Sequence, residues 1–260
     1  MVTSRQGYFA GDLKLYFMTR KSLVLLVVVV AVFVVADLRH VISGDAIILL
    51  AVLVPSVILH EVSHGYVAML FGDDTAKRAG RLTLNPIAHI DPVGSFLLPA
   101  LLIFAGLTPI GYAKPVPVNI SKLRSPRNQS VLVSLSGPAV NIILSVVAGI
   151  LLHLRISQAM APSGLFPVAQ ITLGPSLLDR VLFNMGAINL LLGVFNLIPI
   201  PPLDGSAVIE RVLPADALAR YFHLRRLMLP VVLVLFLVFP GVIGSVFTPI
   251  IDLWIRIFAQ

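Results

Sequence analysis

The chain has 260 residues, of which 58% are hydrophobic and only 12% are charged, and its mean hydropathy is +0.99. Soluble domains are close to half apolar and a quarter charged, so this composition excludes a soluble enzyme, a disordered chain and a coiled coil. The net charge of +7 fits basic loops beside anionic lipid, and no basic patch with interleaved aromatic residues indicates nucleic-acid binding. We therefore expect an integral membrane protein whose partners include the lipid bilayer and no nucleic acid.

Apolar runs that could enter the membrane recur along the chain. The first, Ser22–Leu38, lacks a clean small-x-small cleavage site, so a membrane span is favoured over a cleavable signal peptide. Val93–Leu107 is too short to cross easily and suits a re-entrant hairpin, whereas Pro240-Gly241 interrupts the last run. The runs after the first are, in order, Ala46–Phe71, Val93–Leu107, Val131–His153, Val181–Ile200 and Leu227–Val246.

These runs predict an all-α polytopic membrane protein of about five to six transmembrane helices with a re-entrant segment. We expect one membrane-embedded domain over residues 1–260. Within it, residues 1–45 form an N-terminal tail and first span, 46–205 form the core, and 206–260 form the C-terminal span or spans.

Lys and Arg are distributed unevenly between the loops. Basic residues gather before the first run, after Ala46–Phe71, before Val131–His153 and after Val181–Ile200, and few fall in the remaining loops. Because cytoplasmic loops carry the excess of Lys and Arg, this pattern predicts a multi-pass protein of the cell membrane with a cytoplasmic N-terminus.

The second apolar run contains an H-E-x-x-H motif, His60-Glu61-Val62-Ser63-His64. On a helix, His60 and His64 lie one turn apart on the same face and can bind one Zn²⁺ through imidazole nitrogens. Glu61 beside them can take a proton from water and pass it to a leaving amine. Ionisable residues inside an apolar span are costly, so three of them within five positions favour a functional site over packing.

A catalytic zinc usually has three protein ligands, and the third must come from elsewhere in the chain. Four further histidines and several aspartates are available. Asp204 is the most notable of them because it follows a proline-rich stretch at the end of an apolar run, although Pro201-Pro202-Leu203-Asp204-Gly205 is also ordinary turn chemistry.

In combination, these motifs resemble the site-2 protease family of intramembrane zinc metalloproteases. The resemblance covers most of the chain from about Ala46 to Gly205, and the paired motifs at its two ends are highly specific. The matching motifs are His60-Glu61-x-x-His64, Asn85-Pro86, His89-Ile90-Asp91-Pro92, Gly137-Pro138-x-x-Asn141 and Asn196-x-x-Pro199-x-Pro201-x-Leu203-Asp204-Gly205.

The resemblance implies roles for particular residues and one Zn²⁺ per chain. The positions of His60, His64 and Asp204 correspond to the zinc ligands, and that of Glu61 corresponds to the general acid and base. Asn196 corresponds to a residue that steadies the oxyanion or clamps the substrate backbone. The expected substrate-binding residues are Asn141, Pro199, Pro201, Lys114 and Val116.

Three other features have more than one interpretation. Residues 109–119 are too rich in Pro and Gly for a helix, and in the family this region forms a short membrane-associated β element; a plain loop is the alternative. His89 is either a group near the site or a polar residue at the membrane boundary. The pair Asp73-Asp74 is expected in a solvated turn.

We therefore expect an intramembrane zinc metalloprotease that hydrolyses peptide bonds in or near the transmembrane helices of membrane-protein substrates. Two alternatives come from other classes of protein: a metal-binding membrane transporter and a pseudoprotease that binds helices without cutting them. The transporter would need polar residues along several spans, whereas the polar set here converges on one point. The sequence does not specify the substrate, the regulatory trigger or the oligomeric state.

Overall fold

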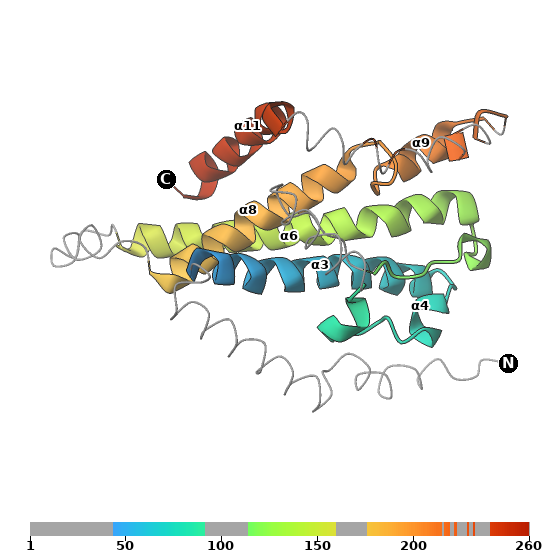
Figure 1. The fold of residues 1–260 in the computed structure, drawn as a ribbon, viewed down its shortest axis with the longest axis horizontal. Helices are drawn as coiled ribbons and strands as arrows, with labels where there is room; N and C mark the ends of the chain where they lie inside the picture. The colour runs from blue at the N-terminus through green and yellow to red at the C-terminus, as the bar shows by residue number, and fades with distance from the viewer. Residues whose placement is uncertain are drawn as a thin grey trace, which may run out of the picture. The chain divides into compact units, whose positions relative to one another are not determined.

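The computed structural model describes residues 44–91, 114–159, 176–214, 216–218, 221–222, 228, 231 and 240–259. Within these residues the secondary structure is helical (Figure 1). The helices are α3 (Gly44–Leu70), α4 (Thr75–Arg78), the 3-10 helices η1 (Pro86–His89) and η3 (Ile120–Lys122), α6 (Pro126–Ala159), α8 (Leu177–Leu197), α9 (Ser206–Val212) and α11 (Pro240–Phe258).

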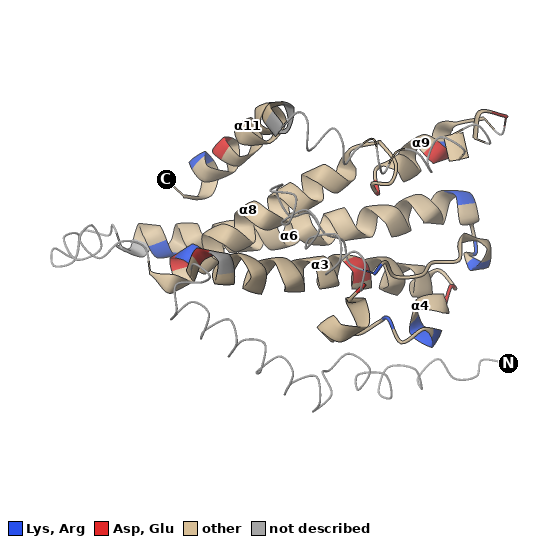
Figure 2. Ribbon diagram, in the orientation of Figure 1, with Lys and Arg blue, Asp and Glu red and all other residues tan. Residues whose placement is uncertain are grey.

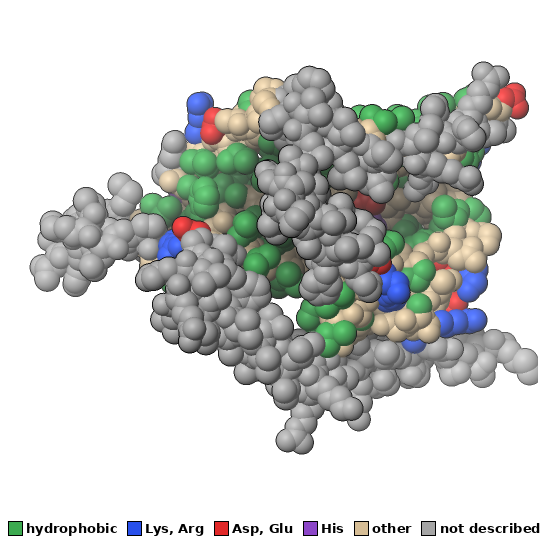
Figure 3. Space-filling model, viewed as in Figure 1, with side chains coloured by type: hydrophobic (Ala, Val, Ile, Leu, Met, Phe, Trp, Pro, Cys, Tyr) green, Lys and Arg blue, Asp and Glu red, His purple; other side chains and the backbone are tan. Residues whose placement is uncertain are grey.

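Three of the described helices are long and apolar enough to cross a membrane: α3 over Ile47–Leu70, α6 over Pro126–Ser157 and α8 over Leu177–Leu197. They confirm the predicted apolar runs Ala46–Phe71, Val131–His153 and Val181–Ile200. Apolar side chains of α6, including Ile143 and Leu151, are exposed, and Figure 3 shows hydrophobic side chains over much of the described surface on the face that it draws. Such exposure suits contact with lipid rather than water.

Other sequence predictions fall wholly or largely outside the described residues. They include the first span, Ser22–Leu38, the re-entrant segment, Val93–Leu107, and most of Leu227–Val246. Of the last run, Pro240 begins α11, which continues to Phe258. A proline is well tolerated at the first turn of a helix, where its missing N–H has no intrahelical acceptor.

The chain divides into two compact units. The first contains Val57–Val133, and the second contains Ile48–Ser56 with Ser134–Gln260. The division cuts α3 and α6, so the expectation of a single domain over residues 1–260 stays a prediction.

In the first unit, an extended segment, Lys114–Asn119, runs beside the C-terminal half of α3. Val116 is buried in a cluster with Ile58 and Val62 of α3, and with Ala76 and Leu82. Farther along, Leu123 and Val133 pack against Ala68. A Cβ at Gly65 would lie 2.8 Å from Val116 Cγ1, so α3 needs a glycine there for the segment to approach this closely.

Lys114–Asn119 is not a strand, which corrects the predicted β element for the part of residues 109–119 that the structure describes. The Lys114 N–H donates to the His89 carbonyl at 2.8 Å, and the Val116 N–H donates to a side chain of α3. Pro115 and Pro117 have no N–H to add to a ladder. The backbone is therefore extended without strand pairing.

The second unit is held together by small residues and a buried polar chain. Gly186 and Gly193 of α8 face Trp254 of α11 and Ile142 of α6, where an added Cβ would clash. The Asn141 amide donates to Asn189 Oδ1 at 2.7 Å, and the Asn189 amide donates to Ser56 Oγ at 2.8 Å. Close approach at small residues and interhelical hydrogen bonds are the two main ways in which membrane helices associate.

Replacing Asn189 by Ala should destabilise the protein, because Asn189 joins side chains of α3 and α6 to α8. Interhelical hydrogen bonds in membranes contribute about 0.6 kcal/mol on average and up to about 1.7 kcal/mol, so the loss of two should cost about 1–3 kcal/mol. The free energy of unfolding can be measured by titration with SDS in mixed micelles. Asn184→Ala is the matched control, because the Asn184 amide donates within its own helix, to the Arg180 carbonyl. Equal stability losses in both variants would contradict the role of the Asn189 chain.

Candidate metal centre

The two histidines of the H-E-x-x-H motif lie on the same face of α3, as their spacing predicts. Both are buried, their rings meet edge to face with centroids 4.7 Å apart, and their Nε2 atoms are 3.1 Å apart. Two nitrogens bound to one tetrahedral Zn²⁺ at about 2.0–2.1 Å are separated by about 3.3 Å. The pair therefore fits a metal ion with little movement of either ring.

A backbone carbonyl orients the second histidine. His64 Nδ1 lies 2.7 Å from the carbonyl oxygen of Val133 in α6. Because a carbonyl can only accept a hydrogen bond, Nδ1 must carry the proton, and this leaves the lone pair of the neutral ring on Nε2. A hydrogen bond from the non-ligating nitrogen is how proteins commonly fix the tautomer of a metal-binding histidine. The sequence carried no signal for this contact, which joins residues 69 positions apart.

A tight turn after α8 sets the position of Asp204. Helix α8 ends at Leu197, where Pro199, Pro201 and Pro202 follow and cannot continue its hydrogen bonding. The chain then folds back, and the Gly205 N–H donates to the Asn196 carbonyl at 2.7 Å. Each of His60, His64 and Asp204 offers one ligand atom, and these three atoms lie within 4.8 Å of one another. Two imidazoles and a carboxylate form a donor set that suits Zn²⁺, so this group could bind the metal.

Glu61 contacts the extended segment Lys114–Asn119. Its Oε2 accepts a hydrogen bond from the Val116 N–H at 2.9 Å. A backbone donor on a carboxylate restricts the rotation of that side chain. Val116, which was expected to bind substrate, therefore contacts the predicted acid and base in this structure.

The other predicted site residues have different surroundings. Asn141 is fully buried in the Asn189 chain of the second unit. The Asn196 amide donates to the Leu192 carbonyl one turn earlier, at 2.9 Å. Lys114 and Pro199 are exposed and Pro201 is buried. Their roles in substrate binding and oxyanion stabilisation stay predictions.

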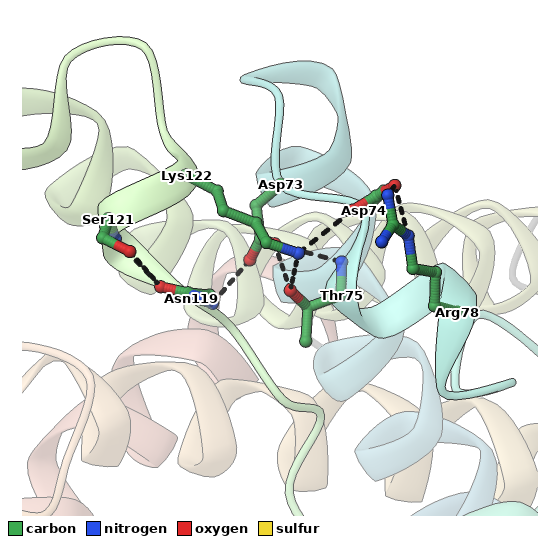
Figure 4. Close-up of polar contacts among 7 residues, drawn as sticks. All are labelled: Asp73, Asp74, Thr75, Arg78, Asn119, Ser121 and Lys122. Carbon is green, nitrogen blue, oxygen red and sulfur yellow. Dashed lines mark hydrogen bonds and ion pairs between the residues drawn. The ribbon is translucent and has the colours of Figure 1, made fainter.

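The structure corrects the expectation of a solvated Asp73-Asp74 pair. Asp73 is fully buried and accepts hydrogen bonds from the Thr75 N–H, the Thr75 hydroxyl and the Asn119 N–H (Figure 4). Only Asp74 is partly exposed, and it pairs with Arg78 and Lys122. Burial raises the pKa of the Asp73 carboxyl, but these hydrogen bonds outweigh burial and hold that pKa below its ordinary value. Asp73 is therefore an ionised group inside the first unit.

His89 is also buried. Its Nε2 lies 2.9 Å from the Thr83 carbonyl, and its own carbonyl accepts from the Lys114 N–H. His89 thus helps to hold the start of the segment that reaches Glu61, and among the described contacts it touches none of the candidate metal ligands.

Comparison with known proteins agrees with this site. The family model described as peptidase family M50 matches residues 48–239. YwhC of Bacillus subtilis, whose name assigns it provisionally as a zinc metalloprotease, is 41% identical over 172 residues, which cover 66% of this chain and 72% of YwhC.

Two mycobacterial proteins named Rip2, with the same provisional assignment, are also similar. The protein from Mycolicibacterium smegmatis is 31% identical over 167 residues, covering 64% of this chain and 58% of that protein. The protein from Mycobacterium tuberculosis is 30% identical over 196 residues, covering 75% of this chain and 68% of that protein. No solved structure matches the chain. The matched region contains the H-E-x-x-H helix, the extended segment and the turn at Asp204, and the chain belongs to peptidase family M50, the site-2 protease family.

Proposed function

We propose that the protein is an intramembrane zinc metalloprotease that hydrolyses peptide bonds in or near the transmembrane helices of other membrane proteins. The grouping of His60, His64 and Asp204 ligand atoms within 4.8 Å carries this proposal. The presence of His60, His64 and Glu61 on a helix long enough to span a membrane supports cleavage at membrane depth.

In this proposal the residues of the site have separate roles. His60, His64 and Asp204 would hold one Zn²⁺, with Val133 fixing the ring of His64. When bound, Zn²⁺ supplies Lewis-acid chemistry, which polarises the scissile carbonyl and lowers the pKa of a water molecule. Glu61 accepts the proton of the attacking water and returns it to the leaving amine. Asn196 donates a hydrogen bond to the developing oxyanion.

A helical substrate must lose its regular structure before it can be cut, because its peptide groups are closed into i to i−4 hydrogen bonds. We assign the holding of an unwound chain to the segment around Lys114 and Val116, to Asn141, and to the proline-rich turn with Pro199 and Pro201. The exposure of Lys114 and Pro115 supports this assignment for the start of the segment.

The N-terminus is proposed to lie in the cytoplasm. Basic residues gather on α4 and at the beginning of α6 (Figure 2), and they include Lys77, Arg78 and Arg127. These positions lie after α3 and in the first turn of α6, and the positive-inside rule assigns such basic clusters at the ends of spans to the cytoplasm.

The zinc content of detergent-purified protein tests the ligand assignment. Wild type should contain about one zinc per chain, and both His64→Ala and Asp204→Asn should contain less. Wild type should also cleave a membrane-spanning test substrate in proteoliposomes, and a chelator should stop this cleavage. If His64→Ala loses zinc and Asp204→Asn keeps it, Asp204 is not a zinc ligand. Zinc flux without cleavage would instead indicate a transporter, and helix binding without zinc would indicate a pseudoprotease.

A further inference from the structure

The buried carboxylate of Asp73 joins two parts of the first unit that are distant in sequence. It lies three residues after the end of α3, and its oxygens accept hydrogen bonds from Thr75, at the start of α4, and from the backbone N–H of Asn119 (Figure 4). Asn119 is the last residue of the extended segment Lys114–Asn119. Asp73 therefore anchors one end of this segment to the end of α3.

The same segment carries the N–H group that contacts Glu61. Val116, three residues before Asn119, donates its N–H to Glu61 Oε2 at 2.9 Å. The Lys114 N–H, at the other end, donates to the His89 carbonyl. The segment thus has an anchor at each end, with the Glu61 contact between them.

The segment has few other ways to hold its backbone. Pro115 and Pro117 have no N–H, so only Lys114, Val116, Val118 and Asn119 can donate a backbone hydrogen bond. The donors of Lys114, Val116 and Asn119 go to His89, Glu61 and Asp73, respectively. Loss of the Asp73 contact would leave the C-terminal end of the segment without one of its three backbone anchors.

We propose that Asp73 is a positioning residue for Glu61, acting through the Asn119 N–H and the extended segment that ends there. The proposal rests on the proposed function, because Glu61 is taken as the acid and base of peptide hydrolysis. Asp73 does not contact Glu61 in the described structure. Its effect is to fix the segment so that the Val116 N–H stays on the Glu61 carboxylate and holds it in one orientation.

The neighbouring aspartate supplies a matched control. Asp74 is 38% exposed and pairs with Arg78 and Lys122 at the surface. Exposed ion pairs of this kind contribute little. The variants Asp73→Asn and Asp74→Asn remove one charge each at adjacent positions. Only Asp73→Asn replaces one of the two acceptor oxygens that serve the Thr75 and Asn119 N–H groups, so the remaining oxygen can no longer hold both.

The experiment compares full-length wild type, Asp73→Asn and Asp74→Asn in detergent, each with its zinc content measured. Peptide-bond cleavage is followed as kcat and KM, and hydrogen–deuterium exchange is followed in the peptide that covers residues 114–119. Because a misplacement of about 1 Å can cost about 100-fold in rate, kcat of Asp73→Asn should fall about 10-fold to 100-fold. KM and zinc content should stay within about twofold. Exchange at Val116 and Asn119 should be faster in Asp73→Asn and unchanged in Asp74→Asn.

If Asp73→Asn does not fold, Asn119→Pro removes the same hydrogen bond from its donor side, with Asn119→Ala as its control. Unchanged kcat and exchange in the folded variant overturn the positioning role. A fall in zinc content that matches the fall in kcat also overturns it, because the defect would then lie in metal binding. A wild type that holds zinc and cleaves nothing contradicts the proposed function instead, and the exchange measurement still tests the link from Asp73 to the segment.

Discussion

Replacing Glu61 by Gln should remove cleavage while leaving the metal in place. The amide has the shape of the carboxylate, but it cannot accept the proton of the attacking water. A positioned acid or base contributes about 10²–10⁴-fold to a rate, so kcat should fall by that factor. The ring of His64 does not depend on Glu61 for its orientation, since the Val133 carbonyl holds it. Zinc content by elemental analysis and cleavage of a transmembrane test substrate measure the two effects separately.

The chain offers a close control for this variant. Glu210, in α9, is the only other glutamate in the sequence, and Glu210→Gln makes the same chemical change outside the candidate site. Its turnover should match that of wild type. Retained turnover in Glu61→Gln would remove Glu61 from the mechanism, whereas loss of zinc in this variant would assign Glu61 to metal binding.

Local patterns in the sequence predicted the parts of the molecule that depend on local structure. The apolar runs gave the three long helices, because about 20 apolar residues are needed to cross a bilayer. The i, i+4 spacing gave the shared face of His60 and His64, because a helix turn has 3.6 residues. Neither inference needed a contact between segments far apart in the chain.

The contacts between distant segments were not predictable in the same way. Asp73 has the sequence surroundings of an ordinary turn, with Gly72 before it and Asp74 after it, and its burial depends on Asn119, 46 residues later. The same is true of Ser56 and Asn189, which are 133 residues apart. Hydropathy records how apolar a helix is, but it does not record which polar side chain on it meets a partner.

The segment Lys114–Asn119 shows why the β element was wrong there. Its prolines exclude a helix, and this much the sequence indicates correctly. The same prolines remove every second N–H, and the donors of Lys114 and Val116 are used by His89 and Glu61. The absence of helix therefore did not imply a strand, because the backbone hydrogen bonds of the segment go to one carbonyl and two carboxylates in place of a neighbouring strand.

Replacing Gly205 by Ala should lower zinc affinity, although Gly205 itself offers no ligand. Its φ of −57° suits any residue, so conformational freedom is not the reason for glycine here. An added Cβ would lie 2.2 Å from the carbonyl oxygen of Leu197 and 2.7 Å from that of Ile198. Both are backbone atoms that cannot rotate away, so the turn must open and move Asp204 relative to His60 and His64. Loss of a group that supports a metal ligand costs about 10–100-fold in affinity, and we expect at least that loss in competition with a zinc chelator.

Two further variants separate the turn from the ligand and from a general effect of alanine. Gly244→Ala, in α11, places a Cβ where no heavy atom lies within 4 Å, and it should bind zinc like wild type. Asp204→Asn keeps the turn but removes the charge, so it should also bind zinc more weakly. Wild-type affinity in both Asp204→Asn and Gly205→Ala would exclude Asp204 from the metal site. Weak binding in Asp204→Asn with full affinity in Gly205→Ala would show that the turn can accommodate a methyl group without displacing the carboxylate. If zinc affinity falls in both Asp204→Asn and Gly205→Ala but not in Gly244→Ala, the third ligand depends on the turn. The close approach of Gly205 to the end of α8 would then be what sets the position of Asp204.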